Sequence, residues 1–141
     1  MIIEINKHDE EILKKINLLE QEIFIESYYN FETLKNMVNK KEYKILVFDE
    51  DVKGYLILHD SYDLYEIMKI AVKKEFRNKK IGEQLINFYL NNWEQNLFLE
   101  VRESNEIARC FYEKIGFVSV GKRKNYYPNG ETAILMSLER N

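Results

Sequence analysis

Hydrophobic residues recur along the chain with two kinds of spacing, which predict helices and strands. Spacings of three and four predict amphipathic helices, and they occur at Ile12, Ile16, Leu19 and Ile23 (residues 8–24) and at Ile81, Leu85 and Phe88. Short apolar or alternating runs bounded by turn residues predict strands, at residues 2–5, 43–48, 55–60, 64–72, 97–102, 117–126 and 132–138. A short helix at residues 31–38 and a helix over residues 105–115 complete the pattern.

The predicted elements follow one another in the order β-α-α-β-β-β-α-β-α-β-β. Short turns join the early strands, which is typical of an antiparallel meander. The helix between strands 64–72 and 97–102 is a crossover that makes those two strands parallel. We therefore expect an α/β fold with a mixed, mostly antiparallel sheet and helices on both faces. Residues 1–141 are expected to form a single domain, because no repeat or linker interrupts them.

Composition narrows the classes of protein to which the chain belongs. Hydrophobic residues make up 45% and charged residues 32%, and the net charge of −3 gives no general attraction to nucleic acid or acidic lipid. No signal peptide or membrane-length apolar run is evident, so we expect a cytoplasmic protein. Cys110 is the only cysteine, which excludes an internal disulfide. His8 and His59 lie far apart, so we expect no metal site.

A carboxylate interrupts the apolar strand at residues 97–102. Leu97, Leu99 and Val101 alternate onto one face, which places Glu100 on the other. A buried carboxylate without a partner is costly. Either a cation that the sequence does not reveal pairs with Glu100, or the Glu100 face opens onto a cleft. In a cleft, this carboxylate can act as a general base.

The helix that follows carries a tyrosine seven residues after an asparagine. At 100° per residue, Asn105 and Tyr112 lie about 20° apart, at the edge of an apolar arc. Two interpretations stay open. Both residues face the cleft of Glu100, where Tyr112, with an ordinary pKa near ~10, can donate a proton; or both are ordinary boundary residues. Cys110 lies within the arc, and we expect its thiol to be buried and inert.

Basic residues crowd the segment after strand 64–72. Five occur within eight residues, at Lys73, Lys74, Arg77, Lys79 and Lys80, and Gly82 stands where the next helix begins. A helix N-terminus offers free N–H groups and a positive dipole end, so this segment suits a pyrophosphate. A solvated basic loop is the alternative. Contact with nucleic-acid phosphates is disfavoured because the patch is short and lacks aromatic residues beyond Phe76.

These segments resemble the GNAT family of N-acetyltransferases over nearly the whole chain. IAVKKEFRNKKIGEQL resembles its acetyl-CoA signature, a strand ending in I-A-V followed by an R/Q-x-x-G-x-G/A loop that opens a helix. LEVRESNEIARCFYEKIGF and RKNYYPNGETAILM resemble, more narrowly, the RimI group, which acetylates the N-terminal alanine of a small-subunit ribosomal protein. The resemblance implies a GNAT fold whose parallel β-α-β core binds acetyl-CoA.

The resemblance also implies roles for individual residues. It places the general base on Glu100, the general acid that protonates the departing thiolate on Tyr112, and a CoA contact on Asn105. The acetyl-CoA-binding strand end and phosphate loop fall on Ile70, Ala71, Val72, Arg77, Asn78, Lys79, Lys80, Ile81, Gly82 and Glu83. Tyr126 and Tyr127 precede the turn at Pro128 and are expected to line the groove for the acceptor peptide, with ordinary hairpin packing as the alternative.

The chain departs from the family pattern at a few positions. Lys80 stands where the first loop glycine is usual, which is tolerable if its φ angle stays negative. Lys74 replaces a common proline. An early P-W pair is absent from ESYYNFETLKNM, and Glu131-Thr132-Ala133 stands where E-D-A is usual. These last two differences bear on the peptide substrate rather than on the chemistry.

We therefore expect an acetyl-CoA-dependent N-acetyltransferase that modifies the N-terminal α-amine of a protein. The expected acceptor is the alanine of a small-subunit ribosomal protein, with no metal, nucleic-acid or membrane partner. The first alternative is another protein N-terminus or a small-molecule amine, and the second is a non-catalytic acetyl-CoA-binding domain. The joint presence of Glu100 and Tyr112 favours an enzyme, because a binding domain needs neither.

Overall fold

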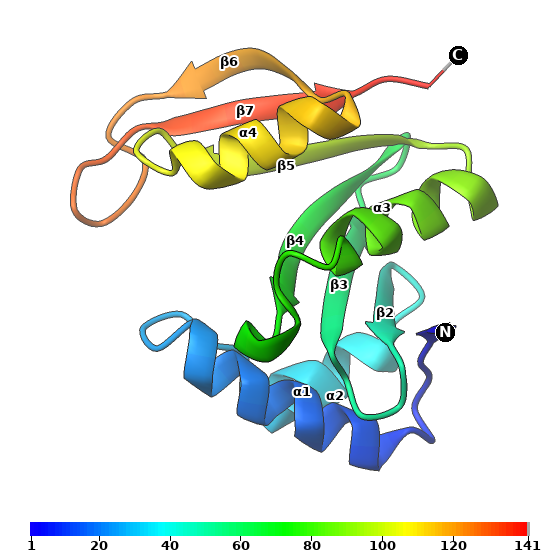
Figure 1. Cartoon of the computed structure of the whole chain (residues 1–141). Coiled ribbons are helices and arrows are strands. Elements are labelled where there is room, and N and C mark those ends of the chain that lie inside the picture. The colour runs from blue at the N-terminus through cyan, green and yellow to red at the C-terminus, as the bar shows by residue number, and fades with distance from the viewer. Residues whose placement is uncertain (141) are drawn as a thin grey trace. The chain divides into compact units, whose positions relative to one another are not determined.

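The computed structural model describes residues 1–140, and its elements follow the predicted order (Figure 1). The strands are β1 (Ile2–Glu4), β2 (Tyr43–Phe48), β3 (Gly54–Asp60), β4 (Leu64–Val72), β5 (Asn96–Arg102), β6 (Val118–Arg123) and β7 (Ala133–Leu138). The helices are α1 (Glu10–Ile23), α2 (Phe31–Val38), α3 (Ile81–Asn92) and α4 (Glu106–Ile115), with a short 3₁₀ turn, η1, at Lys74–Phe76.

Contacts within the chain define two compact units. The first comprises Met1–His59 and Met68–Trp93, and the second comprises Asp60–Ile67 and the chain from Glu94 onward. Strand β4 therefore contributes residues to both. That residues 1–141 form a single domain stays a prediction.

The sheet of the first unit has the strand order β1-β2-β3-β4. Strands β1 and β2, and β2 and β3, pair antiparallel, with Ile45 opposite Ile57 and Leu46 opposite Leu56. Because side chains alternate along a strand, the two pairs point to opposite faces. Ile45 and Ile57 pack in one core with buried residues of α1 and α2. Helix α3 packs against β2 and supplies buried apolar residues of its own.

The second unit orders its strands β4-β5-β7-β6. Strands β4 and β5 pair parallel, with Tyr65 opposite Leu97, whereas β5–β7 and β6–β7 are antiparallel. The predicted parallel crossover and the mixed, mostly antiparallel sheet are therefore confirmed. Helix α4 lies over β5 and β7 (Figure 1). Leu97, Leu99 and Val101 are buried on one face of β5, while residues of its other face remain partly exposed.

Strand β6 ends three residues before the predicted boundary. Asn125 adopts a left-handed conformation (φ 54°), which breaks the extended path. The N–H groups of Tyr126 and Tyr127 both donate to the carbonyl of Glu131, at 3.1 Å, instead of continuing the ladder. The two tyrosines therefore belong to the β6–β7 loop and not to the strand.

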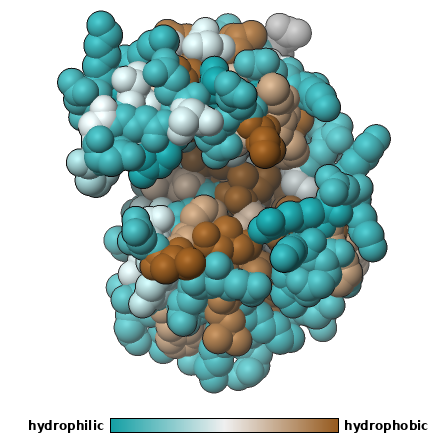
Figure 2. Space-filling model, turned by 60° about the vertical axis from the view of Figure 1, so that its left-hand side comes forward, coloured by the Kyte–Doolittle hydropathy of each residue, from teal (hydrophilic) through white to brown (hydrophobic). Residues whose placement is uncertain are grey.

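Hydrophilic side chains cover most of the face shown in Figure 2, and hydrophobic side chains reach that surface only in places. Within the described residues, no helix is both long enough and apolar enough to span a membrane.

Candidate active site

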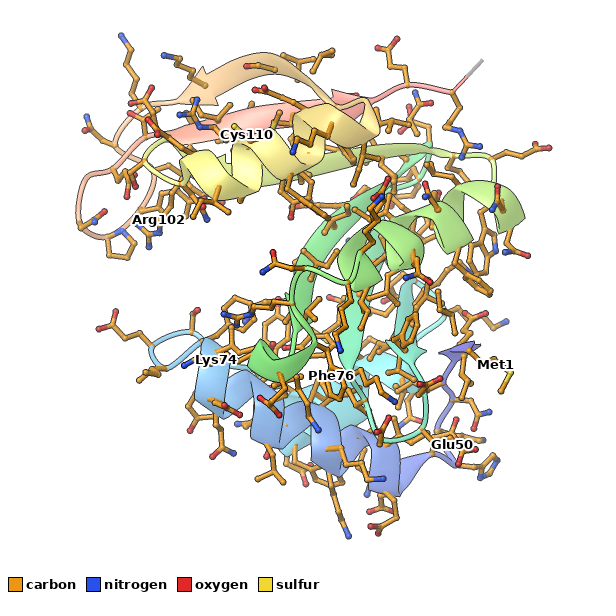
Figure 3. The ribbon with its side chains drawn as sticks, viewed as in Figure 1. Met1, Glu50, Lys74, Phe76, Arg102 and Cys110 are labelled. Carbon is orange, nitrogen blue, oxygen red and sulfur yellow. The ribbon has the colours of Figure 1, made fainter. Side chains whose placement is uncertain are left out.

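The loop after β4 folds back onto the end of its own strand. Arg77 Nε donates a hydrogen bond to the carbonyl of Val72 at 3.1 Å, which ties the loop to the strand. Phe76 in η1 lies beside two ammonium groups, Lys53 at 5.3 Å and Lys79 at 5.6 Å from the ring centroid. Figure 3 shows Lys74 and Phe76 in this segment. The loop is thus tied to the strand end, while its basic residues Lys74, Arg77, Lys79 and Lys80 are exposed, so the solvated-loop alternative stays open.

The N-terminus of α3 has no side-chain cap. Its N-cap residue, Lys80, makes no side-chain capping bond, and the first helical residues, Ile81 and Gly82, are buried. The first N–H groups of any helix have no acceptor within the helix and carry its positive dipole end. Exposed Lys79 and Lys80 add positive charge beside them. These features fit the phosphates of acetyl-CoA.

The condition under which lysine is tolerable at position 80, a negative φ angle, is not met. The φ of Lys80 is +62°, a left-handed conformation, and Asn78 two residues earlier has φ +66°. Asparagine tolerates this region. In lysine the left-handed conformation brings Cβ too close to the backbone carbonyl oxygen, which costs free energy. The loop needs two left-handed residues to turn from β4 into α3, which explains why glycine is usual where Lys80 stands.

Replacing Lys80 with glycine is expected to stabilise the protein. Relief of the left-handed conformation gains ~1–2 kcal/mol, and the greater freedom of glycine in the unfolded chain offsets about 0.4–1 kcal/mol. Urea unfolding should therefore show a small net gain in the free energy of unfolding. Lys79→Gly, outside the left-handed region, should show no gain; a destabilised Lys80→Gly variant would contradict the explanation.

Gly54 is a site residue that sequence reasoning missed. A Cβ at this first residue of β3 would lie 2.9 Å from the Ala71 carbonyl oxygen and 3.0 Å from Ile81 Cγ2. Gly54 thus allows the end of β4 and the start of α3 to approach β3 closely. The sequence signal was a glycine that closes the DEDVKG turn immediately before an apolar strand.

Gly54→Ala is expected to raise the KM for acetyl-CoA and to destabilise the fold by ~1–3 kcal/mol, the usual cost of overpacking. The new methyl must displace Ala71 or Ile81, both in the segment proposed to hold the co-substrate. Steady-state kinetics and urea unfolding measure the two effects. Gly121→Ala is the control, because its Cβ would meet only Leu135 Cδ1, at 3.6 Å; equal effects in both variants would refute the role of Gly54.

Glu100 lies on the more open face of β5 in the second unit. Its side chain is 15% exposed, and Arg123 Nε of β6 lies 3.5 Å from its Oε1. The hydrogen bond and negative charge of the carboxylate raise the pKa of the Tyr126 hydroxyl. The first interpretation of Glu100 is therefore confirmed, because a cation pairs with it. That its face opens onto a cleft stays a prediction.

Tyr112 is buried on α4 among aromatic rings. Its ring lies 5.2 Å from that of Phe111 and 5.4 Å from that of Phe117. Burial raises the pKa of its hydroxyl well above the ordinary value, so the group stays protonated at neutral pH. The aromatic contacts of Tyr112 are with Phe111 and Phe117, and neither involves Glu100.

The structure changes the interpretation of two other α4 residues. Asn105 is the N-cap, outside the helix, and its Oδ1 accepts a hydrogen bond from Ala108 N at 3.1 Å. The 100° relation to Tyr112 therefore does not apply to it. The predicted burial of Cys110 is wrong: it is exposed on α4 (Figure 3), because the helix buries the side that carries Tyr112.

The β6–β7 loop is held by Arg102 at the end of β5 (Figure 3). Arg102 Nη1 donates to Glu131 Oε1 at 3.2 Å, and its guanidinium lies 4.0 Å from the ring centroid of Tyr127. Ser104 N donates to Glu131 Oε2 at 2.8 Å; these donors lower the pKa of Glu131. The rings of Tyr126 and Tyr127 pack edge to face at 5.2 Å. The loop thus presents ordered aromatic side chains, with Tyr126 the more exposed.

Comparison with known proteins decides the family. The family model described as an acetyltransferase (GNAT) domain matches residues 5–140. The chain belongs to the GNAT acetyltransferase family. It is therefore an acetyl-CoA-dependent N-acetyltransferase, and the resemblance drawn from its segments is confirmed.

Relatives of this acetyltransferase include named ribosomal-protein enzymes. It is 34% identical, over 118 residues, to the ribosomal protein bS18-alanine N-acetyltransferase of Haemophilus influenzae, with 77% of this chain and 80% of that protein covered. The crystal structure of the S18-alanine N-acetyltransferase from Escherichia coli superposes with a TM-score of 0.78 at 25% identity, covering 98% and 92% of the two chains. An aminoglycoside 6′-N-acetyltransferase complexed with coenzyme A shares the fold, with a TM-score of 0.84 at 18% identity over 98% and 96%.

The acetyltransferase also contains a buried charge cluster that the sequence did not predict. Glu20 of α1 is fully buried, and Lys69 Nζ of β4 donates to its Oε1 at 2.9 Å. Tyr29 N donates to the same oxygen at 2.7 Å, and the Tyr55 hydroxyl donates to Oε2. One signal was available: Glu20 falls four residues after Ile16, on the apolar side of the helix.

The predicted site residues of the acetyltransferase divide between the two units. The strand end from Ile70 to Val72 and the loop from Arg77 to Glu83 belong to the first unit, whereas Glu100, Asn105 and Tyr112 belong to the second, with Tyr126 and Tyr127. Among residues 1–140, no cluster of three histidine, cysteine or acidic side chains is arranged to hold a metal ion.

Proposed function

We propose that this acetyltransferase transfers an acetyl group from acetyl-CoA to the N-terminal α-amine of a protein, with the N-terminal alanine of a small-subunit ribosomal protein as its acceptor. The observation that carries the proposal is Glu100, a partly open carboxylate beside the ordered Tyr126–Tyr127 loop. The similarity to relatives named for this reaction supports the choice of acceptor. The proposed place of action is the cytoplasm.

In the proposed mechanism, Glu100 removes a proton from the acceptor amine. An α-amine has a pKa near ~7.7–8.0, so part of it is already neutral at physiological pH, whereas a lysine amine, near ~10.4, is much harder to deprotonate. A carboxylate with one weak ion pair is a suitable acceptor for that proton. This difference in amine pKa favours a protein N-terminus over an internal lysine.

The first unit is proposed to hold the thioester donor. The backbone of Ile70, Ala71 and Val72 would bind the pantetheine arm, and an N–H near Ala71 or Val72 would stabilise the oxyanion that forms on attack. The loop from Arg77 to Glu83 would bind the phosphates through the N-terminus of α3. Holding amine and thioester together supplies much of the acceleration.

Tyr112 is the proposed general acid that protonates the departing CoA thiolate. Its raised pKa keeps it protonated at every pH at which a protein N-terminus reacts. Asn105 is proposed to contact CoA through its amide nitrogen, since its oxygen caps α4.

A peptide panel tests the proposed acceptor. Purified protein and acetyl-CoA are incubated with peptides that differ only at the first residue, with an internal-lysine peptide whose N-terminus is blocked, and with small amines including an aminoglycoside. The expected result is that the alanine peptide has the highest kcat/KM and the blocked peptide is unmodified. A small amine that outperforms every peptide would refute the proposal. Mass spectrometry of ribosomal protein N-termini, with and without the enzyme, then identifies the natural acceptor.

A further inference from the structure

Glu100 has a weakly held cationic partner. Arg123 Nε lies 3.5 Å from Glu100 Oε1, longer than the 2.7–2.9 Å typical of a charge-assisted hydrogen bond. The Arg123 side chain is 54% exposed. An ion pair this long and this open to solvent contributes little to stability. A contribution to the stability of the fold therefore does not explain why Arg123 lies beside Glu100.

The buried pair of Glu20 and Lys69 shows what a structural ion pair looks like in the same protein. Its ions are 2.9 Å apart, with side-chain exposures of 0% and 10%, and Lys69 also donates to the carbonyl of Ser27 at 2.8 Å. Separating Lys69 from Glu20 would leave a buried charge without a partner. Arg123, in contrast, already contacts the ring of Tyr126, whose centroid lies 5.6 Å from its Cζ, so water can replace Glu100 around its exposed guanidinium.

We propose that Arg123 is a displaceable counterion, which occupies Glu100 in the free enzyme and yields this position to the positively charged amine of the acceptor. The inference rests on the proposed function, because it takes Glu100 as the carboxylate that receives the amine. Guanidinium and ammonium groups compete for the same acceptor oxygens. Arg123 thus keeps the carboxylate paired between turnovers and lowers the apparent affinity for the acceptor. It acts through Glu100 and is a positioning residue.

Arg123→Gln should lower the KM for the alanine peptide about two- to fivefold, the range set by the weakness of an exposed ion pair. The KM for acetyl-CoA should stay unchanged, because the proposed donor-binding residues belong to the first unit. Arg123→Lys keeps a cation and should retain the wild-type KM. The control is Lys122→Gln, which removes the same charge at the neighbouring position. Lys122 pairs with Glu103, at 3.0 Å, and not with Glu100.

The outcomes separate this inference from the proposed function. An unchanged or raised peptide KM in Arg123→Gln, with an active wild-type enzyme, overturns the counterion role alone. An equal decrease in Lys122→Gln also overturns it, since net charge would then explain the effect. A wild-type enzyme that acetylates no peptide overturns the proposed function instead. Unfolding midpoints of the three variants show whether each is folded.

Discussion

Glu100→Gln is expected to lower kcat for the alanine peptide by at least about 100-fold near pH 6.5. A positioned general base contributes roughly 10²–10⁴-fold, and glutamine keeps the size and polarity of the side chain while losing the ability to accept the proton. The KM for acetyl-CoA should not change, because Glu100 belongs to the second unit and the donor is assigned to residues of the first.

The pH dependence gives this prediction its sharpest test. With an α-amine pKa near 7.8, the neutral fraction of the free peptide rises from about 5% at pH 6.5 to about 94% at pH 9. The deficit of Glu100→Gln should therefore shrink toward high pH, where the amine no longer needs a base. Glu103→Gln is the matched control, an exposed carboxylate on the same segment paired with Lys122. A deficit that is constant from pH 6.5 to 9 would show that Glu100 does not act as the base.

Tyr112→Phe completes the test of the acid–base pair. Phenylalanine keeps the ring contacts with Phe111 and Phe117 but removes the hydroxyl proton. We expect kcat to fall by a similar factor with little change in the free energy of unfolding. Near-normal turnover in both Glu100→Gln and Tyr112→Phe would refute the catalytic assignment while leaving the family membership intact.

Lys69→Met is expected to reduce the free energy of unfolding by ~3–5 kcal/mol, because it leaves the buried Glu20 carboxylate without its cation. Lys69 also lies 3.9 Å from the ring centroid of Phe24 and 4.3 Å from that of Tyr29. Methionine fills similar space but supplies neither charge nor donors. Urea unfolding measures the change, provided that the dependence of the free energy of unfolding on urea concentration is the same in both proteins.

Two comparisons make the Lys69 result interpretable. Lys14→Met breaks an exposed pair with Glu11, 3.2 Å apart, and should cost less than ~1 kcal/mol. The double variant Lys69→Met with Glu20→Gln should be more stable than Lys69→Met alone, because no charge is then left buried and unpaired. If Lys69→Met lowers the free energy of unfolding as little as Lys14→Met does, the buried pair of Glu20 and Lys69 stabilises the fold no more than an exposed pair.

The predictions from sequence fared best where the signal is local. The helices predicted at residues 8–24 and 31–38 are observed as α1 and α2. The structure adds that Asn30 caps α2, its side chain accepting a hydrogen bond from Thr33 N at 2.8 Å. The parallel pairing of β4 and β5 follows from the crossover between them. The predicted burial of Cys110 was wrong, because the apolar arc of a helix does not show how much of that arc the sheet covers. The sequence left the φ angle of Lys80 open, because the identity of a side chain does not reveal the backbone conformation that the loop imposes on it.

The sequence by itself determined the order of the elements, the mixed sheet and the family, since these depend on spacing and short motifs within continuous segments. Only the tertiary structure decided which charges pair. Glu20 and Lys69 are 49 residues apart, and Arg123 reaches Glu100 through the register of β5, β7 and β6. Close approaches such as that at Gly54 also come from packing between elements. These contacts join distant parts of the chain, and their energies depend on burial and register, which no local pattern specifies.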